Sequence, residues 1–268
     1  MEIVILLLVG FVAGSLGGLL GIGGSVIMIP ATAIILGWPF HLAQAVAMTV
    51  NPAVALSASI KHQKNQNISW WTHATVLPTA IGCICVAAWY SNQIQSYWLE
   101  LLFGIFLIWV LWDQIQALKS KGHTPPIPGH NSLARSAITG GTTGTMAGLL
   151  GIGGGLIQVP LLNRLCGLPI KKAIGTSSSI MIATAILGAT VKNQTLGECV
   201  DQNGISLNLT ASDALLKSLW LIPGALLGGW LGAKLTNVLP VKIIRSIFGL
   251  LVGLASLKMI SSAWPHLF

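Results

Sequence analysis

Long apolar segments alternate with short polar ones along nearly the whole 268-residue chain. Most apolar segments have about 20 residues, the length that an α-helix needs to cross the hydrocarbon core of a membrane. The pattern predicts an all-α polytopic membrane protein, because a membrane β-barrel would show short segments of alternating apolar and polar residues. The predicted helical segments are residues 2–20, 25–36, 42–60, 70–90, 96–118, 132–150, 155–166, 172–191, 213–233 and 242–262.

Two of these helical regions contain the same interrupted sequence. Residues 14–30 read GSLGGLLGIGGSVIMIP and residues 144–160 read GTMAGLLGIGGGLIQVP, at an offset of 130. Each is an apolar run that Gly-Ile-Gly-Gly interrupts and that resumes near Ser25 or Gly155. Small residues could simply let neighbouring helices pack closely. However, glycine-interrupted segments at matching positions of two halves are typical of a transporter's binding site, and the duplication favours this interpretation.

The duplication extends beyond the glycine segments. With an offset of 128, Ala45 and Val46 meet Ala173 and Ile174, which places Asn51 opposite Ser179. With an offset of 145, Phe103 and Gly104 meet Phe248 and Gly249. The change of offset places the extra residues of the second half in the polar segment 193–212. We therefore predict a first repeat at 1–118, a linker at 119–131 and a second repeat at 132–268, together forming one membrane domain.

The charges in the loops predict how the two repeats are oriented. The apolar runs 25–36 and 155–166 would be about 18 Å long as helices, too short to cross a core of about 30 Å. If each run turns back, each half crosses the membrane an odd number of times and the second repeat is inverted. With the 119–131 linker in the cytoplasm, 11 of the 14 lysines and arginines lie inside, against 8 for parallel repeats. The positive-inside rule favours inversion, with both termini extracytoplasmic.

Composition narrows the chemistry that the chain could perform. Hydrophobic residues make up 53% of the chain and charged residues only 7%, and the net charge is +8. Because the basic residues lie in short loops, where they report topology, we expect contact with the lipid bilayer and none with nucleic acid. The four cysteines have no metal-ligand or redox spacing and are interpreted as packing residues. They are Cys83, Cys85, Cys166 and Cys199.

Ionisable residues within the predicted segments give no sign of a catalytic or proton-carrying site. Glu100 and Asp113 lie near the two ends of their segment, so we expect both to be solvated and proton symport not to be obligatory. No cluster of histidine and carboxylate residues indicates an enzyme or a metal centre. We therefore expect no catalytic residues, metal or cofactor. A polar site must then come from the backbone and from neutral side chains.

The glycine breaks supply such groups. A helix that starts at each break presents unpaired N–H groups and the positive end of its dipole, and helix N-termini bind oxyanions in this way. Each following segment carries polar side chains, although serine and threonine could instead bond to their own helix. The predicted substrate-binding residues are Gly21, Gly23, Gly24, Ser25, Thr49, Asn51, Gly151, Gly153, Gly154, Gly155, Gln158, Thr176, Ser177 and Ser178. The predicted hinges or helix breaks are Pro30, Pro52 and Pro160.

These motifs resemble the sulfite exporter TauE/SafE family, also called the toluene-sulfonate uptake permease family. The resemblance rests on G-x-x-G-G-L-L-G-I-G-G-S and G-x-x-A-G-L-L-G-I-G-G-G, each followed by an apolar run and a proline, and on A-I-G-T-S-S-S at 173–179. It covers essentially the whole chain. It implies a multi-pass transporter of the bacterial cell membrane for sulfite, thiosulfate, or sulfonates such as sulfoacetate.

The direction of transport follows from the membrane potential. An inside-negative potential of 100 mV favours exit of an anion by about 2.3 kcal/mol per charge. A carrier without a titratable group near the midplane could therefore export anions unaided, and we expect export or facilitated passage. An anion channel or a cation-coupled importer would use the same donors and stays open as an alternative. The sequence does not select one sulfur anion or an oligomeric state.

Overall fold

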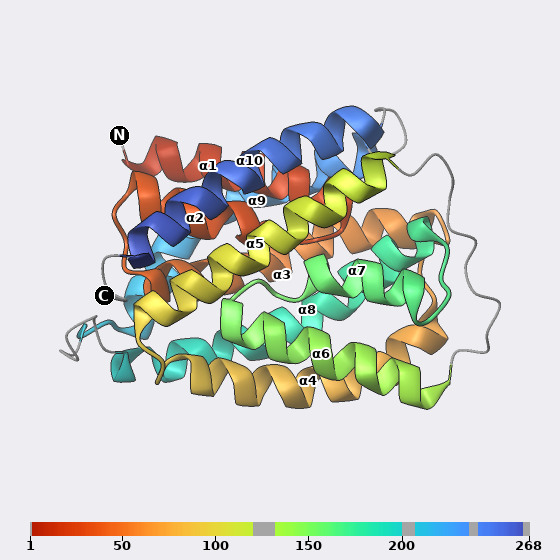
Figure 1. Ribbon diagram of the computed structural model, residues 1–268, viewed down its shortest axis with the longest axis horizontal. Helices are drawn as coiled ribbons and strands as arrows, with labels where there is room; N and C mark the ends of the chain where they lie inside the picture. Colours follow the sequence, from red (N-terminus) through yellow and green to blue (C-terminus); the bar gives the residue numbers. More distant parts are fainter. Residues whose placement is uncertain (1, 120–131, 200–206, 236–240, 265–268) are drawn as a thin grey trace.

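The computed structural model describes residues 2–119, 132–199, 207–235 and 241–264, and over these residues the fold is all-helical (Figure 1). All the predicted segments are α-helices, which confirms the fold class. The helices are α1 (Glu2–Leu20), α2 (Ser25–Ile35), α3 (Phe40–Lys64), α4 (Trp70–Ser91), α5 (Ser96–Lys119), α6 (Leu133–Leu150), α7 (Gly155–Arg164), α8 (Ile170–Gln194), α9 (Ala211–Leu235) and α10 (Val241–Ala263), with a 3₁₀ turn at Leu196–Glu198.

Six of the described helices are long and apolar enough to cross a membrane, namely α1, α3, α4, α5, α8 and α9. Large apolar side chains cover the outer surface, including Trp71 at 65% and Leu257 at 70% exposure. An exposed apolar surface of this extent is stable in lipid and not in water. The two helices at the centre of the bundle, α3 and α8, are instead mostly buried.

The two halves of the chain are interleaved. The first helix of each half packs along the fourth helix of the other half, so that α1 lies against α9 and α6 lies against α4. The third helices, α3 and α8, pack on each other, and so do the fifth helices, α5 and α10. The short helices α2 and α7 lie against α3 and α8 respectively. Each of the pairings named here thus has a counterpart in which the two halves exchange places, or joins equivalent helices of the two halves. Figure 1 shows the arrangement of these helices.

Glycines at every fourth position allow the closest of these pairings. One face of α1 carries Gly10, Gly14 and Gly18, and the matching face of α6 carries Gly140, Gly144 and Gly148. A Cβ atom at any of these positions would collide with the backbone of α9 or of α4. Small residues at such spacing let transmembrane helices approach closely. For these glycines, including two from each repeated segment, the packing interpretation is therefore correct.

This packing predicts that leucine substitutions at two different glycines have very different effects on thermal stability. Replacing Gly144 with leucine is expected to lower the midpoint of thermal unfolding in detergent by about 5 °C or more, because overpacking costs about 1–3 kcal/mol or more. Gly82 of α4 is the matched control, since a Cβ atom there meets nothing within 4 Å. Gly82→Leu should leave the midpoint and the yield of monodisperse protein unchanged. Equal behaviour of the two variants would contradict this account of the α4–α6 pairing.

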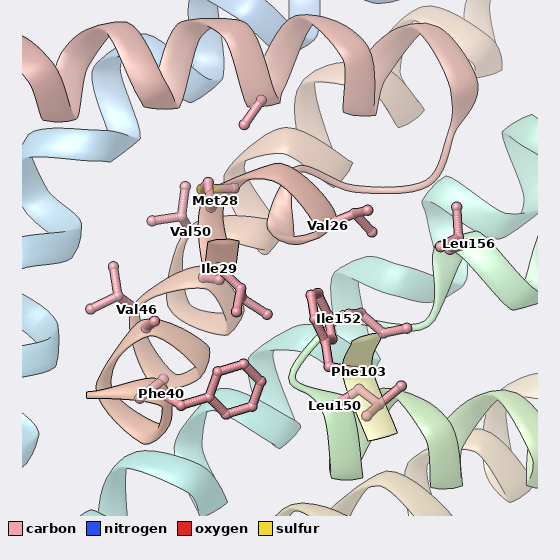
Figure 2. Packing of buried hydrophobic residues seen from close by; sticks show 14 of the residues in the cluster. Val26, Met28, Ile29, Phe40, Val46, Val50, Phe103, Leu150, Ile152 and Leu156 are labelled. Carbon is pink, nitrogen blue, oxygen red and sulfur yellow. The ribbon is translucent and has the colours of Figure 1, made fainter. Parts of the chain in front are cut away.

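The apolar core joins the two glycine hairpins through α3. Figure 2 shows Val26 and Ile29 of α2 on one side and Ile152 and Leu156 of the second hairpin on the other, all within one buried cluster. Phe40, at the start of α3, makes an edge-to-face contact with Phe103 of α5, with ring centroids 5.8 Å apart. This cluster fixes the hairpins relative to the central helices.

Two expectations about individual residues are wrong. Pro30, Pro52 and Pro160 lie inside α2, α3 and α7, so none of them breaks its helix, and only their role as hinges stays a prediction. A proline removes a single N–H donor, and in an apolar environment the remaining backbone groups are still best satisfied within the helix.

The second wrong expectation is that Glu100 is solvated. Its side chain is 9% exposed and its Oε2 has no hydrogen-bond partner, because α10 packs along this face of α5.

Candidate functional site

The two glycine breaks form loops that connect the helices of each hairpin. Gly21, Gly23, Gly151 and Gly153 have φ values of 68°, 78°, 71° and 67°, and Gly154 has a φ of 94°. Residues with a Cβ atom rarely adopt this left-handed region, so the loops require glycine. The helices that follow, α2 and α7, have only 11 and 10 residues. Each break is therefore followed by a helix too short to cross the membrane.

The two loops, which we call the tips (residues 21–24 and 151–154), come together at the starts of α2 and α7. An ideal Cβ atom at Gly155 would lie 2.8 Å from the backbone carbon of Ile22. The tips also contact the opposite long helix, since a Cβ atom at Gly151 would lie 2.8 Å from Cβ of Gln44. Two helix N-termini with their positive dipole ends therefore meet near the middle of the bundle.

Asn51 of α3 lies between the two tips and is fully buried. Its Oδ1 accepts a hydrogen bond of 3.1 Å from the backbone N–H of Gly24, and its Nδ2 donates one of 2.9 Å to Oγ of Ser25. On the other side, a Cβ atom at Gly153 would lie only 2.7 Å from Asn51 Nδ2. One amide side chain thus contacts both tips, with its oxygen held at the start of α2.

Met181 of α8 occupies the equivalent place in the second half. A Cβ atom at Gly23 would lie 2.9 Å from Sδ of Met181, and one at Gly153 would lie 3.5 Å from its Cγ. The bounds of α3 and α8 differ by 130 residues at both ends. Asn51 therefore corresponds to Met181, and the predicted equivalence with Ser179 is wrong. The repeated Gly-x-Pro before each helix, at Gly37 and Gly167, is the sequence signal that would have given this register.

Polar side chains from the second half complete the site. Ser177 Oγ lies 3.1 Å from Oε1 of Gln158 and 3.4 Å from the carbonyl oxygen of Gly21, so its hydroxyl hydrogen can donate to either. Thr184 Oγ donates to the carbonyl oxygen of Gly153 at 3.4 Å. Ser177 and Gln158 are both buried. Gln158 and Thr184 also line a narrow crevice beside Gly153 and Gly154.

Three predicted residues lie away from the tips. Thr49 Oγ donates to the carbonyl of Ala45 and accepts from the side chain of Asn193. Thr176 Oγ accepts from the backbone N–H of Ser69, and Ser178 Oγ donates within α8. The reason is the helical period: positions 177, 181 and 184 share one face, whereas 176 and 178 are turned about 100° away from 177. The other predicted positions lie at the tips or contact them.

Sequence analysis missed the most deeply buried charge in the described part of the chain. Lys192, on the last turn of α8, has no exposed surface. Its Nζ donates hydrogen bonds of 2.7 Å to Gln44 Oε1 and to Ser91 Oγ. Gln44 Nε2 in turn donates to the carbonyl of Leu149, at the end of α6. Lys192 is thereby connected to the second tip.

The site contains hydrogen-bond donors at two helix N-termini and neutral side chains. None of the residues named here carries a carboxylate. Such a site suits an oxyanion. Paired discontinuous helices at the contact between two halves, together with six helices that can span a bilayer, define a multi-pass membrane transporter. The chain matches the family described as "Sulfite exporter TauE/SafE" over residues 6–259, and it belongs to this family. The resemblance seen in the sequence is thus confirmed.

Curated relatives are named as membrane transporters. The chain is 26% identical to the "Probable membrane transporter protein MamO" of Paramagnetospirillum magneticum, over 97% of this chain and 45% of that protein, so it spans about half of MamO. It is 28% identical to the "Probable membrane transporter protein MJ0441" of Methanocaldococcus jannaschii, over 96% and 94% of the two chains. For the "Probable membrane transporter protein YunE" of Bacillus subtilis the identity is 27%, over 97% and 98%. No solved structure matches the chain.

Proposed function

We propose that this protein carries small sulfur-containing anions across the membrane by export or facilitated passage. Sulfite, thiosulfate and sulfonates such as sulfoacetate are the candidate substrates, and the family name supports this class. One observation carries the proposal: the N-termini of α2 and α7 meet around buried Asn51, and the side chains between them are neutral. A tetrahedral oxyanion needs several converging donors, which two helix N-termini supply without a cationic side chain.

In this mechanism the anion replaces the acceptor that now occupies the site. The oxygen of Asn51 accepts the N–H of Gly24, and an anion oxygen takes its place when the tips separate. Ser25 and Ser177 then turn their hydroxyl hydrogens toward the anion, since a hydroxyl can act as donor or acceptor. The tips are in contact with each other. Passage to either face therefore requires one hairpin to move relative to α3 and α8.

The proposed orientation has two inverted repeats, 1–118 and 132–268, with both termini extracytoplasmic and the protein in the bacterial cell membrane. In Figure 1, α1 runs inward from the end of the bundle marked N, whereas α6 enters from the opposite end, which supports inversion. The linker at 119–131 lies outside the described residues except for Lys119, and we place it in the cytoplasm from the loop charges.

Topology can be tested by labelling single cysteines with a membrane-impermeant maleimide in intact cells. Cysteines introduced near the two termini are expected to be labelled from outside, whereas a cysteine at Ser132 should be labelled only after the cells are opened. The four native cysteines are first replaced, because all four are free thiols. Termini on opposite faces of the membrane would contradict the inverted arrangement.

The proposed function predicts that anion flux follows the membrane potential. For a monovalent sulfonate in proteoliposomes, 100 mV should drive accumulation on the positive side up to about 50-fold, and a pH gradient alone should drive none. Glu100→Gln should cost at most a modest part of the rate, because Glu100 lies between α5 and α10 and not at the tips. Accumulation driven by pH alone and abolished by Glu100→Gln would instead indicate a proton-coupled importer.

The same liposomes distinguish a carrier from an anion channel of the same architecture. A carrier shows saturable flux and counterflow, in which unlabelled anion on one side accelerates entry of labelled anion from the other. We expect both for this protein, with sulfite, thiosulfate and sulfonates compared against sulfate as a panel. Flux that does not saturate and shows no counterflow would favour the channel.

A further inference from the structure

The central site described above does not explain why the side chain of Lys192 is buried. Its ammonium group has no exposed surface, and removing a charged group from water costs several kcal/mol unless an opposite charge compensates. Its two acceptors, Gln44 Oε1 and Ser91 Oγ, are neutral. An ammonium carries three donors, so one more remains for another acceptor. The ion pair found among the described residues joins Arg164 to Asp113 and leaves Lys192 without a carboxylate.

The surroundings of Lys192 contain further basic or neutral groups. His41 of α3 is also fully buried and lies near enough to Lys192 for the two to repel each other when both are charged. It lies close to the backbone of Ile94, but neither of its ring nitrogens makes a well-formed hydrogen bond. Burial raises the pKa of the nearby Cys199 thiol to about 11, so this thiol is neutral at pH 7. Two buried basic side chains therefore lie in one region, and the described residues named here supply no counter-charge for them.

The position of Lys192 relates it to the tips. Lys192 follows Met181 by eleven residues of the same helix, which is about 16 Å along the helix axis. Because Met181 lies at the tips, Lys192 lies between the central site and the end of the bundle. Its partner Gln44 donates to the carbonyl of Leu149 at the end of α6 and lies against Gly151 of the second tip. An ionisable residue buried inside a membrane transporter is a candidate for the route of an ion.

We propose that Lys192 and His41 form a second anion-binding position, which a small sulfur oxyanion occupies between the tips and this end of the bundle. In the empty state, the oxygens of Gln44 and Ser91 hold the ammonium. When the anion arrives it becomes the third acceptor of the ammonium and accepts the imidazole N–H of His41. The inference rests on the proposed anion transport and adds a cationic position to a pathway whose central site is neutral.

The test compares three lysine variants of the full chain with sulfite as the probe. Lys192→Gln is expected to raise the KM for sulfite flux about tenfold or more, since a hydrogen bond to a charged group is worth at least this factor. Lys192→Arg should keep the KM close to that of the unmodified protein. Lys258→Gln, which removes an exposed lysine of α10, is the control and should change nothing.

Thermal unfolding in detergent with and without sulfite gives a second readout that does not depend on flux. Sulfite should raise the unfolding midpoint of the unmodified protein, because a ligand stabilises the state that binds it, and this increase should be lost in Lys192→Gln. If Lys192→Gln does not fold, Gln44→Leu replaces it: removing the neutral acceptor leaves the charge in place, so the increase caused by sulfite should become larger.

These outcomes separate the inference from a purely structural role of Lys192. A residue that only fastens α8 to α3 and α4 would lower the midpoint in both Lys192 variants but leave the KM and the sulfite-induced increase unchanged, which would overturn the inference. The thermal measurement still tests the Lys192 site if the unmodified protein does not transport sulfite. In that case the proposed function fails, whereas loss of the sulfite-induced increase in Lys192→Gln still supports the site.

Discussion

Replacing Gly153 with valine is expected to abolish anion flux while leaving a folded protein. The backbone of Gly153 has a φ of 67°, which a β-branched residue adopts only with strain. A Cβ atom at this position would also lie 2.7 Å from Nδ2 of Asn51. The added methyl groups therefore fill the space between the second tip and Asn51, where the anion is proposed to bind. Flux in proteoliposomes should fall to the level of protein-free vesicles, and Gly23→Val should behave in the same way.

The matched control for this variant is Gly37→Val. Gly37 has a similar φ of 64°, but a Cβ atom there meets nothing within 4 Å. It therefore carries the backbone strain without the contact at the tips, and its flux should remain close to that of the unmodified protein. If Gly153→Val and Gly23→Val also transport normally in correctly folded protein, the glycine tips serve only close packing.

Asn51→Asp is expected to give a folded protein that does not transport. The carboxylate would stand between the two positive helix ends and accept the N–H of Gly24, as the amide oxygen does now. Ser25 could then donate its hydroxyl hydrogen to the second carboxylate oxygen, because its Oγ already lies at the amide nitrogen. The variant would thus hold a tethered anion in the proposed site. Favourable interaction of a carboxylate with a helix N-terminus is worth about 0.3–2 kcal/mol.

The comparison that tests this prediction is Asn51→Leu. It has a similar volume but leaves the N–H of Gly24 without an acceptor, so it should also lose flux and should unfold at a lower temperature than Asn51→Asp. Thr49→Ala, on the same helix but away from the tips, should retain most of the flux. If Asn51→Asp proves the less stable of the two Asn51 variants, the tips do not form an anion site, since an uncompensated buried carboxylate would then dominate.

The helices and the class of protein could be predicted from the sequence because the hydrocarbon core of a bilayer restricts the backbone conformations that a chain can adopt. Within a bilayer each backbone N–H and C=O must be satisfied inside its own segment, so an apolar run of sufficient length has to be helical. The predicted boundaries agree with the structure to within a few residues. The positions of the tips could be predicted for a related reason: consecutive glycines interrupt the apolar runs at the same place in both halves, at residues 21–24 and 151–154.

The sequence by itself therefore determined the ten α-helices of the described residues, the two glycine tips and the membrane class, all of which depend on local properties of the chain. The tertiary structure alone decided which face of α3 and α8 meets the tips, and it selected Asn51 and Ser177 over Thr49, Thr176 and Ser178. It also buried Glu100, for which solvation was expected, and Lys192, which lies near a helix end. Burial of these residues depends on which helices pack against their own, and such contacts between distant segments leave no periodic pattern in the sequence.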